Sequence, residues 1–149
     1  MKLRVYLDTS VFSALYDDRV IERQGETEEF WKRRDQFDIA TSELACEELE
    51  QTPDPGRRTS LRQLLDEVTV NPITTEMRNL AEQYIESGTF TMVMYNDALH
   101  VAAAVLTRQD VLLSWNFKHL VNRRRRAEIN QENISRGLPT IEIVAPPEI

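Results

Sequence analysis

Short apolar runs alternate with longer amphipathic stretches along this chain of 149 residues. Residues 3–7, 37–40, 111–115 and 140–144 are short runs rich in apolar and β-branched side chains, which is the pattern of strands. Residues 68–72 form either a further strand or an extended turn. The pattern therefore predicts four strands, with a fifth left open at residues 68–72.

Helices are expected between these strands, because the intervening stretches contain apolar residues at helical spacing or residues that begin and end helices. We expect helices over 11–16, from 17 or 18 through 34, from a cap at Thr41 or Ser42 through 51, over 57–67, over 75–87 and over 97–107 with Asn96 as its cap, and a loop and helix over 116–130. Strands that alternate with helices indicate a parallel α/β sheet covered on both faces. In such sheets ligands gather at the carboxyl ends of the strands.

The composition is that of an ordinary globular chain, with 41% hydrophobic and 29% charged residues. The length is typical of one domain, so we expect a single domain over residues 1–149. The one cysteine, Cys46, excludes an intramolecular disulfide framework and a Cys-based zinc site. The sequence contains neither an apolar run long enough for a membrane span nor a cleavable signal pattern. We therefore expect a cytoplasmic protein with no membrane partner.

The charge is distributed unevenly along the chain. The net charge is −7, from 18 Lys and Arg against 25 Asp and Glu. Residues 111–127 nevertheless contain no acid and carry five positive side chains, Lys118, Arg123, Arg124, Arg125 and Arg126. An acidic body with one basic segment could hold a cation and a polyanion together, whereas the simpler interpretation of the arginine run is a solvated helix face.

Three carboxylates stand next to apolar segments. Asp8 directly follows the first strand, where it can lie at the rim of the sheet or cap the next helix. Glu48 falls within the apolar arc of its helix, and a buried carboxylate must be protonated, paired or bound to metal, unless an edge position lets it reach water. Asp97 begins an apolar helix, where the helix dipole alone would favour an acid.

These three acids come from three distant segments, so we expect them to converge on one site. Asn116 follows the strand at 111–115, either as a further oxygen ligand or as a simple turn residue. Oxygen ligands suit Mg²⁺ or Mn²⁺ better than zinc. Beside a basic segment that holds a nucleic-acid backbone, such a site fits metal-assisted cleavage of phosphodiester bonds.

Four segments of the chain resemble the PIN-domain ribonucleases, in particular the VapC-like toxins of bacterial toxin–antitoxin pairs. These segments are VYLDTSVFSAL (5–15), IATSELACEEL (39–49), NDALHVAAA (96–104) and VLLSWNFKHLVN (111–122). The resemblance implies a three-layer α/β/α sandwich on a mostly parallel sheet of about five strands. It also implies a Mg²⁺- or Mn²⁺-dependent endoribonuclease that hydrolyses RNA phosphodiester bonds.

The site residues of this family carry over onto the chain one by one. The family's first acid matches Asp8, its helix glutamate matches Glu48, and its acid before Ala-Leu-His matches Asp97. The resemblance therefore implies that these three residues bind the metal. Ser10 and Ser114 match hydroxyl residues that support the site.

The fourth position departs from the family's pattern. Many members have Asp where this chain has Asn116, so metal affinity should weaken and a second metal is in doubt, although some members read Asn here. We expect Asn116 to belong to the catalytic site and to orient the metal's water or the phosphate. His100 is expected to pack or hydrogen-bond, and His119 to be structural or to contact phosphate. The residues expected to bind RNA are Lys118, Arg123, Arg124, Arg125 and Arg126.

The resemblance also implies partners: an RNA substrate, a cognate antitoxin that covers the acidic site, and a second copy of the chain in a homodimer. Two other functions stay open. The fold could have lost useful metal affinity through Asn116 and bind RNA or a protein partner without cleavage. A phosphatase with Asp8 as its nucleophile is the weaker alternative, because the second acid of haloacid-dehalogenase-type sites is missing two residues later.

Overall fold

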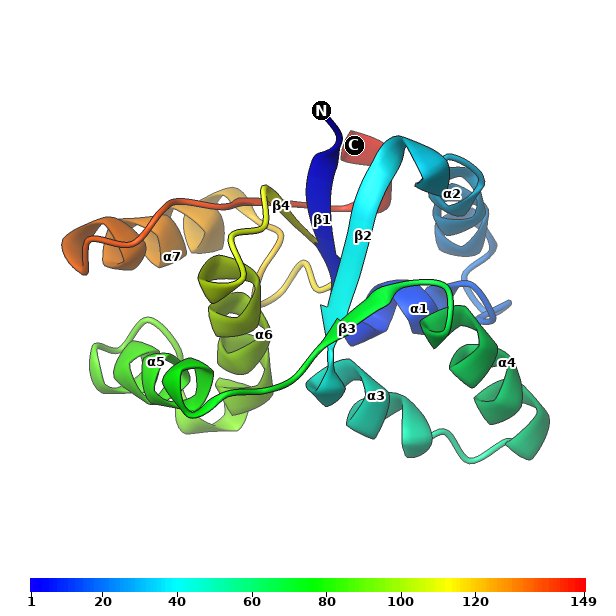
Figure 1. Cartoon of the computed structure of the whole chain (residues 1–149), viewed down its shortest axis with the longest axis horizontal. Helices are drawn as coiled ribbons and strands as arrows, with labels where there is room; N and C mark the ends of the chain where they lie inside the picture. The colour runs from blue at the N-terminus through cyan, green and yellow to red at the C-terminus, as the bar shows by residue number, and fades with distance from the viewer.

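The computed structural model describes all 149 residues. Five parallel strands form one sheet in the order β3-β2-β1-β4-β5 (Figure 1). The strands are β1 (Leu3–Leu7), β2 (Phe37–Ser42), β3 (Thr69–Asn71), β4 (Val111–Leu113) and β5 (Glu142–Val144). Residues 69–71 do pair with β2, so the open choice at residues 68–72 resolves to a strand.

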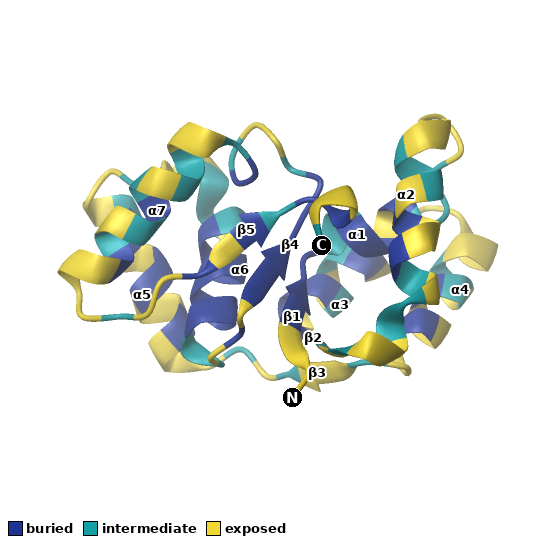
Figure 2. Cartoon of the chain, turned by 90° about the horizontal axis from the view of Figure 1, so that it is seen from above, coloured by how far each residue is buried: buried dark blue, intermediate teal, exposed yellow.

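Helices cover both faces of the sheet. The α-helices are α1 (Thr9–Ala14), α2 (Ile21–Lys32), α3 (Glu43–Glu50), α4 (Pro55–Leu65), α5 (Thr75–Glu86), α6 (Tyr95–Leu106) and α7 (Arg123–Ser135), and the 3₁₀ turns are η1 (Arg34–Gln36), η2 (Met92–Met94) and η3 (Pro146–Glu148). Figures 1 and 2 show α1–α4 on one side of the sheet and α5–α7 on the other. The predicted three-layer α/β/α sandwich is therefore confirmed.

Three early helices begin at other residues than predicted. The helix expected over 11–16 begins at Thr9, and Asp8 is its N-cap. The helix expected from residue 17 or 18 begins at Ile21. Asp17 forms a tight turn instead, because its Oδ1 accepts hydrogen bonds from the backbone N–H and the Nε of Arg19. The helix expected over 57–67 begins at Pro55 with Asp54 as its N-cap, since proline is well suited to the first helical position.

Two later helices also differ from the prediction. Helix α6 begins at Tyr95, and Asn96 is not its cap. The Asn96 amide points instead to Glu48, with Nδ2 lying 3.5 Å from Oε2. Helix α7 runs past the expected end at residue 130 to Ser135, and Asn122 caps it by accepting a hydrogen bond from the backbone N–H of Arg125 at 2.9 Å.

The core lies around the two central strands. Residues 5–7 of β1 and 111–113 of β4 are buried, and every residue of α6 from Ala98 to Val105 is buried as well (Figure 2). A helix that is apolar on all sides must pack into the interior, so α6 is held firmly against the sheet. This packing fixes where the first turn of α6 meets the carboxyl edge of the sheet. None of the helices combines the length and apolar character that crossing a bilayer requires.

Candidate active site

The sequence-predicted site residues meet at the carboxyl edge of the sheet. Asp8 follows β1, Glu48 lies on α3 after β2, Asp97 lies in the first turn of α6, and Asn116 follows β4. Hydrogen bonds connect several of them: Asn116 Nδ2 donates to Asp97 Oδ1 at 3.2 Å. Ser114 donates to Asp8 and accepts from the backbone N–H of Asn116. The edge of the sheet thus brings segments together that are far apart in the sequence.

Asp8 is a buried carboxylate that receives hydrogen bonds from two hydroxyls. Ser10 Oγ donates to Oδ1 at 2.5 Å, and Ser114 Oγ donates to Oδ2 at 2.5 Å. Each hydroxyl also accepts a backbone N–H from the segment after β4, so its own proton is directed at Asp8. Burial raises the pKa of Asp8, and the negative charge of Asp97 raises it further, against the opposite effect of His100. Asp8 is therefore a buried acid without an ion-pair partner.

Glu48 is half-buried and held by an imidazole. Its Oε1 accepts hydrogen bonds from His100 Nε2 at 2.7 Å and from Thr9 Oγ1 at 2.6 Å. Burial acts to raise the pKa of Glu48, but the hydrogen bonds and charge of His100, with the hydroxyl of Thr9, lower it overall. The Glu48 side chain remains 31% exposed. The sequence left open whether Glu48 is protonated, paired, bound to metal or in reach of water. In the structure Glu48 is paired with His100 and also reaches solvent.

A buried chain of hydrogen bonds continues behind Glu48. His100 Nδ1 lies 2.7 Å from the hydroxyl of Tyr6, which lies 2.7 Å from Ser42 Oγ. Burial raises the pKa of Tyr6 well above its usual range, so this phenol stays protonated. Because the phenol of Tyr6 bonds to Nδ1, the opposite ring nitrogen, Nε2, is directed at Glu48. These hydrogen bonds therefore fix the orientation of Oε1 of Glu48, whereas its Oε2 has no short hydrogen bond.

Asp97 is held from the other side of the site by Asn116 and His119. Its Oδ2 lies 2.8 Å from His119 Nδ1, and its Oδ1 accepts the 3.2 Å hydrogen bond from Asn116. Asn116 Oδ1 in turn accepts from the backbone N–H of His119 at 2.9 Å. Because both amide atoms are engaged, Asn116 is more than a simple turn residue. An Asp at this position would have no N–H to offer to Asp97.

The donor chemistry of the three acids fits a hard divalent cation. All the candidate ligand atoms are carboxylate or amide oxygens, which Mg²⁺ and Mn²⁺ prefer. The buried Asp8 has no cationic partner and feels the like charge of Asp97, and a bound cation would remove both costs. With the side chains as they stand, however, no three His, Cys, Asp or Glu form a group that could hold a metal ion. Glu48 and Asp97 each face an imidazole instead.

Two of the arginines that were expected to bind RNA are engaged in structural contacts. Arg125 is only 13% exposed, its guanidinium carbon lies 4.7 Å from the ring centre of Phe90, and its Nη1 pairs with Glu128 at 2.7 Å. Arg126 donates to the backbone oxygen of Ile143 and lies 3.4 Å from Glu148. The contacts with Phe90, Ile143 and Glu148 hold α7 against the rest of the fold, so the arginine run is not one uniform basic surface.

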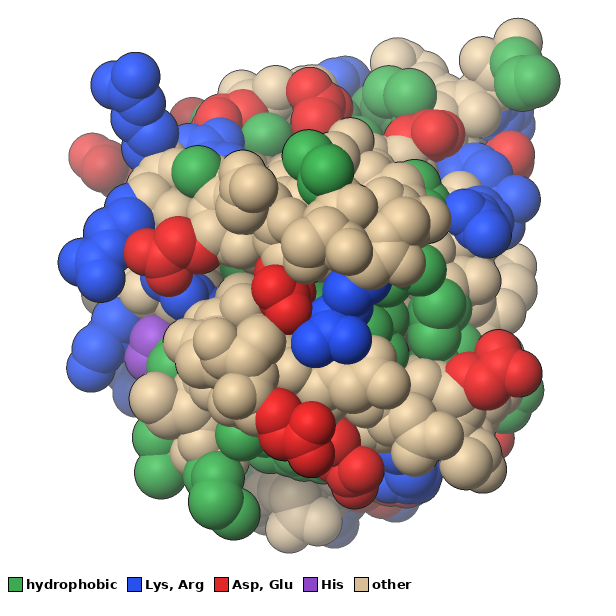
Figure 3. All heavy atoms as spheres, turned by 90° about the vertical axis from the view of Figure 1, so that its left-hand side faces the viewer, with side chains coloured by type: hydrophobic (Ala, Val, Ile, Leu, Met, Phe, Trp, Pro, Cys, Tyr) green, Lys and Arg blue, Asp and Glu red, His purple; other side chains and the backbone are tan.

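The remaining positive side chains are open to solvent near His119. Lys118 and Arg123 are exposed, and the Arg124 side chain is 86% exposed although it pairs with Glu128. Lys118, His119 and Arg124 line one shallow surface hollow. Figure 3 shows Lys and Arg side chains at the margin of this face beside a histidine. Positive charge is therefore accessible next to the Asp97 side of the site.

The sequence does not reveal the role of two residues in the hydrogen bonds around Glu48, Thr9 and Tyr6. Thr9 stands among the residues directly after the first strand, but the sequence gives it no role, whereas its hydroxyl donates to Glu48. Tyr6 was read only as part of an apolar strand, yet its hydroxyl bonds to His100. A polar atom within a buried strand is the signal that could have shown Tyr6, because such an atom needs a hydrogen-bond partner.

Comparisons with known proteins agree with this fold. The family model described as PIN domain matches residues 5–118. No curated protein matches the sequence. The segment matched by the family model includes all three candidate acids and Asn116, but only part of the basic segment.

Several solved structures share the fold at low sequence identity. VapC20 of Mycobacterium tuberculosis, described as a sarcin-ricin loop cleaving toxin, is similar with a TM-score of 0.64 and 16% identity over 76% of this chain and 91% of that chain. The DNA-bound VapBC of Salmonella typhimurium gives 0.63 and 16% identity over 97% and 98%. FitAcB of Neisseria gonorrhoeae gives 0.63 and 12% identity over 97% and 99%. At these identities the similarity establishes the shared fold.

Proposed function

Because the chain belongs to the PIN domain family, we propose that it is a metal-dependent endoribonuclease that hydrolyses RNA phosphodiester bonds as the toxin of a toxin–antitoxin pair. The observation that carries this proposal is the meeting of Asp8, Glu48, Asp97 and Asn116 at the carboxyl edge of the sheet. The likeness to VapC20, whose description names it a toxin that cleaves the sarcin-ricin loop, supports it.

Asp8, Glu48 and Asp97 are the residues that would hold Mg²⁺ or Mn²⁺. When bound, such an ion polarises a phosphate and lowers the pKa of a water molecule. The chain's own contribution is to orient the three acids. Hydroxyls direct their protons at Asp8, and the imidazole of His100 holds Glu48.

Asn116 and the accessible positive side chains would act on the substrate. Asn116 keeps Asp97 in place, next to where the scissile phosphate would lie. Lys118, Arg123 and Arg124 would attract the RNA backbone, and their contribution should weaken as salt concentration rises. Arg125 and Arg126 would support this surface through their contacts within the fold.

A catalytically weakened module that binds RNA or a protein without cleavage is the second candidate. The observation in its favour is Asn116, which brings no negative charge to the fourth position and is hydrogen-bonded to Asp97. A neutral ligand at this place reduces the attraction for a divalent cation.

An antitoxin partner, a homodimer and a site of action in the cytoplasm belong to the same proposal. Their support is the likeness to toxin–antitoxin complexes, among them VapBC of Salmonella typhimurium and a complex of Klebsiella pneumoniae. An acidic site of this kind would attract a basic residue of an antitoxin.

Cleavage of total bacterial RNA tests the enzymatic proposal. We expect fragments to form with Mn²⁺ or Mg²⁺ and not with EDTA, and we expect Asp97→Asn to lower the rate at least about a hundredfold, because one anionic ligand is lost. Asp66→Asn is the matched control, since Asp66 is exposed and lies outside the site. RNA that binds intact under every metal condition would instead favour the binding module.

A further inference from the structure

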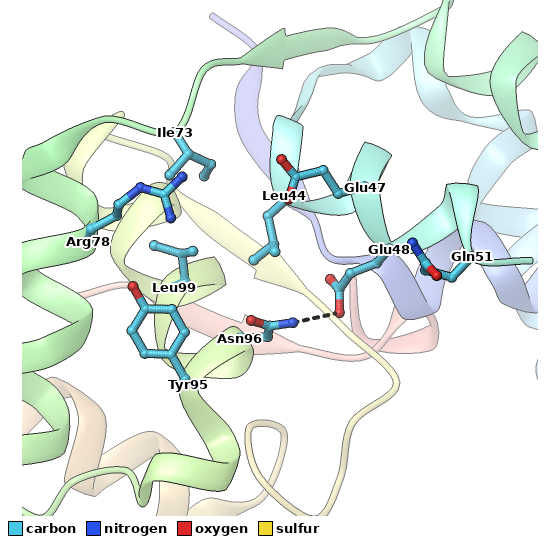
Figure 4. A pocket seen from close by; sticks show the side chains of 9 residues that line it. All are labelled: Leu44, Glu47, Glu48, Gln51, Ile73, Arg78, Tyr95, Asn96 and Leu99. Atoms are coloured by element: carbon cyan, nitrogen blue, oxygen red, sulfur yellow. Dashed lines mark hydrogen bonds between the residues drawn. The ribbon is translucent and has the colours of Figure 1, made fainter.

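A pocket of about 280 Å³ opens directly beside Glu48 (Figure 4). It lies between α3, the start of α5 and the first turns of α6. The buried side chains of Leu44 and Leu99 give it an apolar lining, and the half-buried ring of Tyr95 forms part of its wall. Apart from Glu48, none of its lining residues belongs to the three acids or to the basic surface near His119.

Two charged side chains of the pocket are free to bind a ligand. Arg78 and Glu47 both line it, both are exposed, and neither takes part in an ion pair or a side-chain hydrogen bond. Figure 4 shows Arg78 and Tyr95 on one side, with Glu47 and Glu48 across from them. The Asn96 amide joins this pocket to the acidic site through its contact with Glu48. The pocket is therefore continuous with the place where the acids meet.

We propose that this pocket is a nucleobase subsite, which holds one unstacked base of single-stranded RNA and prefers bases with an exocyclic amino group. The inference rests on the proposed ribonuclease function, since the pocket opens beside Glu48, one of the acids that would act on the RNA. Proteins bind single-stranded RNA by stacking bases on aromatic rings and hydrogen-bonding their edges. Tyr95 supplies the ring, Glu47 an acceptor, and Arg78 donors.

The charge of the pocket explains why a base fits better than a phosphate. Two carboxylates, Glu47 and Glu48, face one guanidinium, so an anion would be repelled from the centre. A base is neutral, and its apolar faces suit the lining of Leu44 and Leu99. A carboxylate accepts hydrogen bonds from the amino groups of cytosine, adenine or guanine, whereas uracil has no amino group to offer.

The test measures binding of labelled hexauridylate and of three versions with one central A, C or G, by fluorescence anisotropy in EDTA so that no metal-dependent cleavage occurs. We expect hexauridylate to bind most weakly, by roughly fivefold or more. Glu47→Gln should erase this preference, because an amide donates as well as accepts. Glu82→Gln is the matched control, an exposed glutamate on α5 outside the pocket, and it should keep the preference.

Variants of Tyr95 test the stacking separately. Tyr95→Leu keeps apolar volume but removes the ring, and should weaken all four oligomers by roughly five- to a hundredfold. Tyr95→Phe keeps the ring and should bind within about twofold of the wild type. A thermal melt of each variant shows that it is folded before its affinity is compared.

The outcomes separate the subsite from the proposed function. Equal affinity for the four oligomers, no binding of any of them, or wild-type binding by Tyr95→Leu would overturn the subsite; the last is also the result expected if the pocket serves a peptide. Base-selective binding without any metal-dependent cleavage would leave the subsite standing and reject the ribonuclease. Cleavage that depends on Asp97 together with unselective binding would reject the subsite alone.

Discussion

At the scale of single residues, Asn116 changes the chemistry of the site most. Its Nδ2 donates to Asp97 and its Oδ1 accepts from the backbone of His119, so the amide satisfies two neighbours at once. A carboxylate here would repel Asp97 and lose one of these hydrogen bonds. Without metal, Asn116 therefore avoids the repulsion between two carboxylates. With metal, the site offers the cation one anionic ligand fewer.

Asn116→Asp should reverse this balance. In EDTA the variant should be less stable by about 1–3 kcal/mol, because a hydrogen bond to a charged group is lost and a like charge is added. In Mn²⁺ it should bind the ion more tightly than the wild type. Urea unfolding in EDTA and Mn²⁺ titration check the two effects.

Asn79→Asp is the control for Asn116→Asp, since Asn79 is exposed on α5. It should change neither stability in EDTA nor Mn²⁺ affinity. An Asn116→Asp variant as stable as the wild type in EDTA would show that the hydrogen bond to Asp97 contributes little.

At the scale of elements, a series of hydrogen bonds from Ser42 through Tyr6 and His100 to Glu48 joins two strands and two helices. It runs from the end of β2 through β1 and α6 to α3. Groups that orient metal-binding carboxylates act through such hydrogen bonds. The orientation of Glu48 is therefore decided by the packing of α6 on the sheet as well as by α3.

His100→Leu should weaken Mn²⁺ binding by roughly ten- to a hundredfold, because Glu48 loses its imidazole donor. Tyr6→Phe should have a smaller effect in the same direction, since His100 remains but is no longer held by the phenol. Mn²⁺ binding is measured by electron paramagnetic resonance of the free ion.

Tyr84→Phe is the matched control for Tyr6→Phe. Tyr84 is also buried and donates to Asn133, but this hydrogen bond lies away from the three acids. It should lower stability without changing Mn²⁺ affinity. Unchanged Mn²⁺ affinity in both His100→Leu and Tyr6→Phe would show that these hydrogen bonds stabilise the fold without affecting metal binding.

At the scale of the whole molecule, the acids come from both helical layers. Helices α3 and α6, which carry Glu48 and Asp97, lie on opposite sides of the sheet (Figure 1). Asp8 follows the central strand β1. The molecule also carries a net charge of −7. A cation bound by all three acids would connect the two layers and bind only the folded chain.

Mn²⁺ should therefore raise the melting temperature. A ligand at a hundred times its dissociation constant adds about 2.7 kcal/mol to the free energy of unfolding. The shift should disappear in Asp8→Asn and persist in Asp66→Asn. Thermal melts in EDTA and in millimolar Mn²⁺ make the comparison, and a wild type that does not shift would favour the binding module.

The succession of strands and helices along the chain and the candidate acids could be predicted from the sequence, because both depend on local patterns. Apolar runs and helical spacing depend on neighbouring residues, and an acid after an apolar run is visible without a structure. Helix ends were less accurate, because Asp17 and Asn96 use their side chains in a turn and in a distant contact rather than as caps.

Only the tertiary structure decided the distant partners of the acids. Asp8 and Ser114 are 106 positions apart in the sequence, and Glu48 and His100 are 52 apart. The same holds for Arg125, whose charge looked available in the sequence but is packed over Phe90. Local sequence determines which elements form and which polar groups stand at their ends, whereas hydrogen-bond partners and burial depend on how distant elements pack.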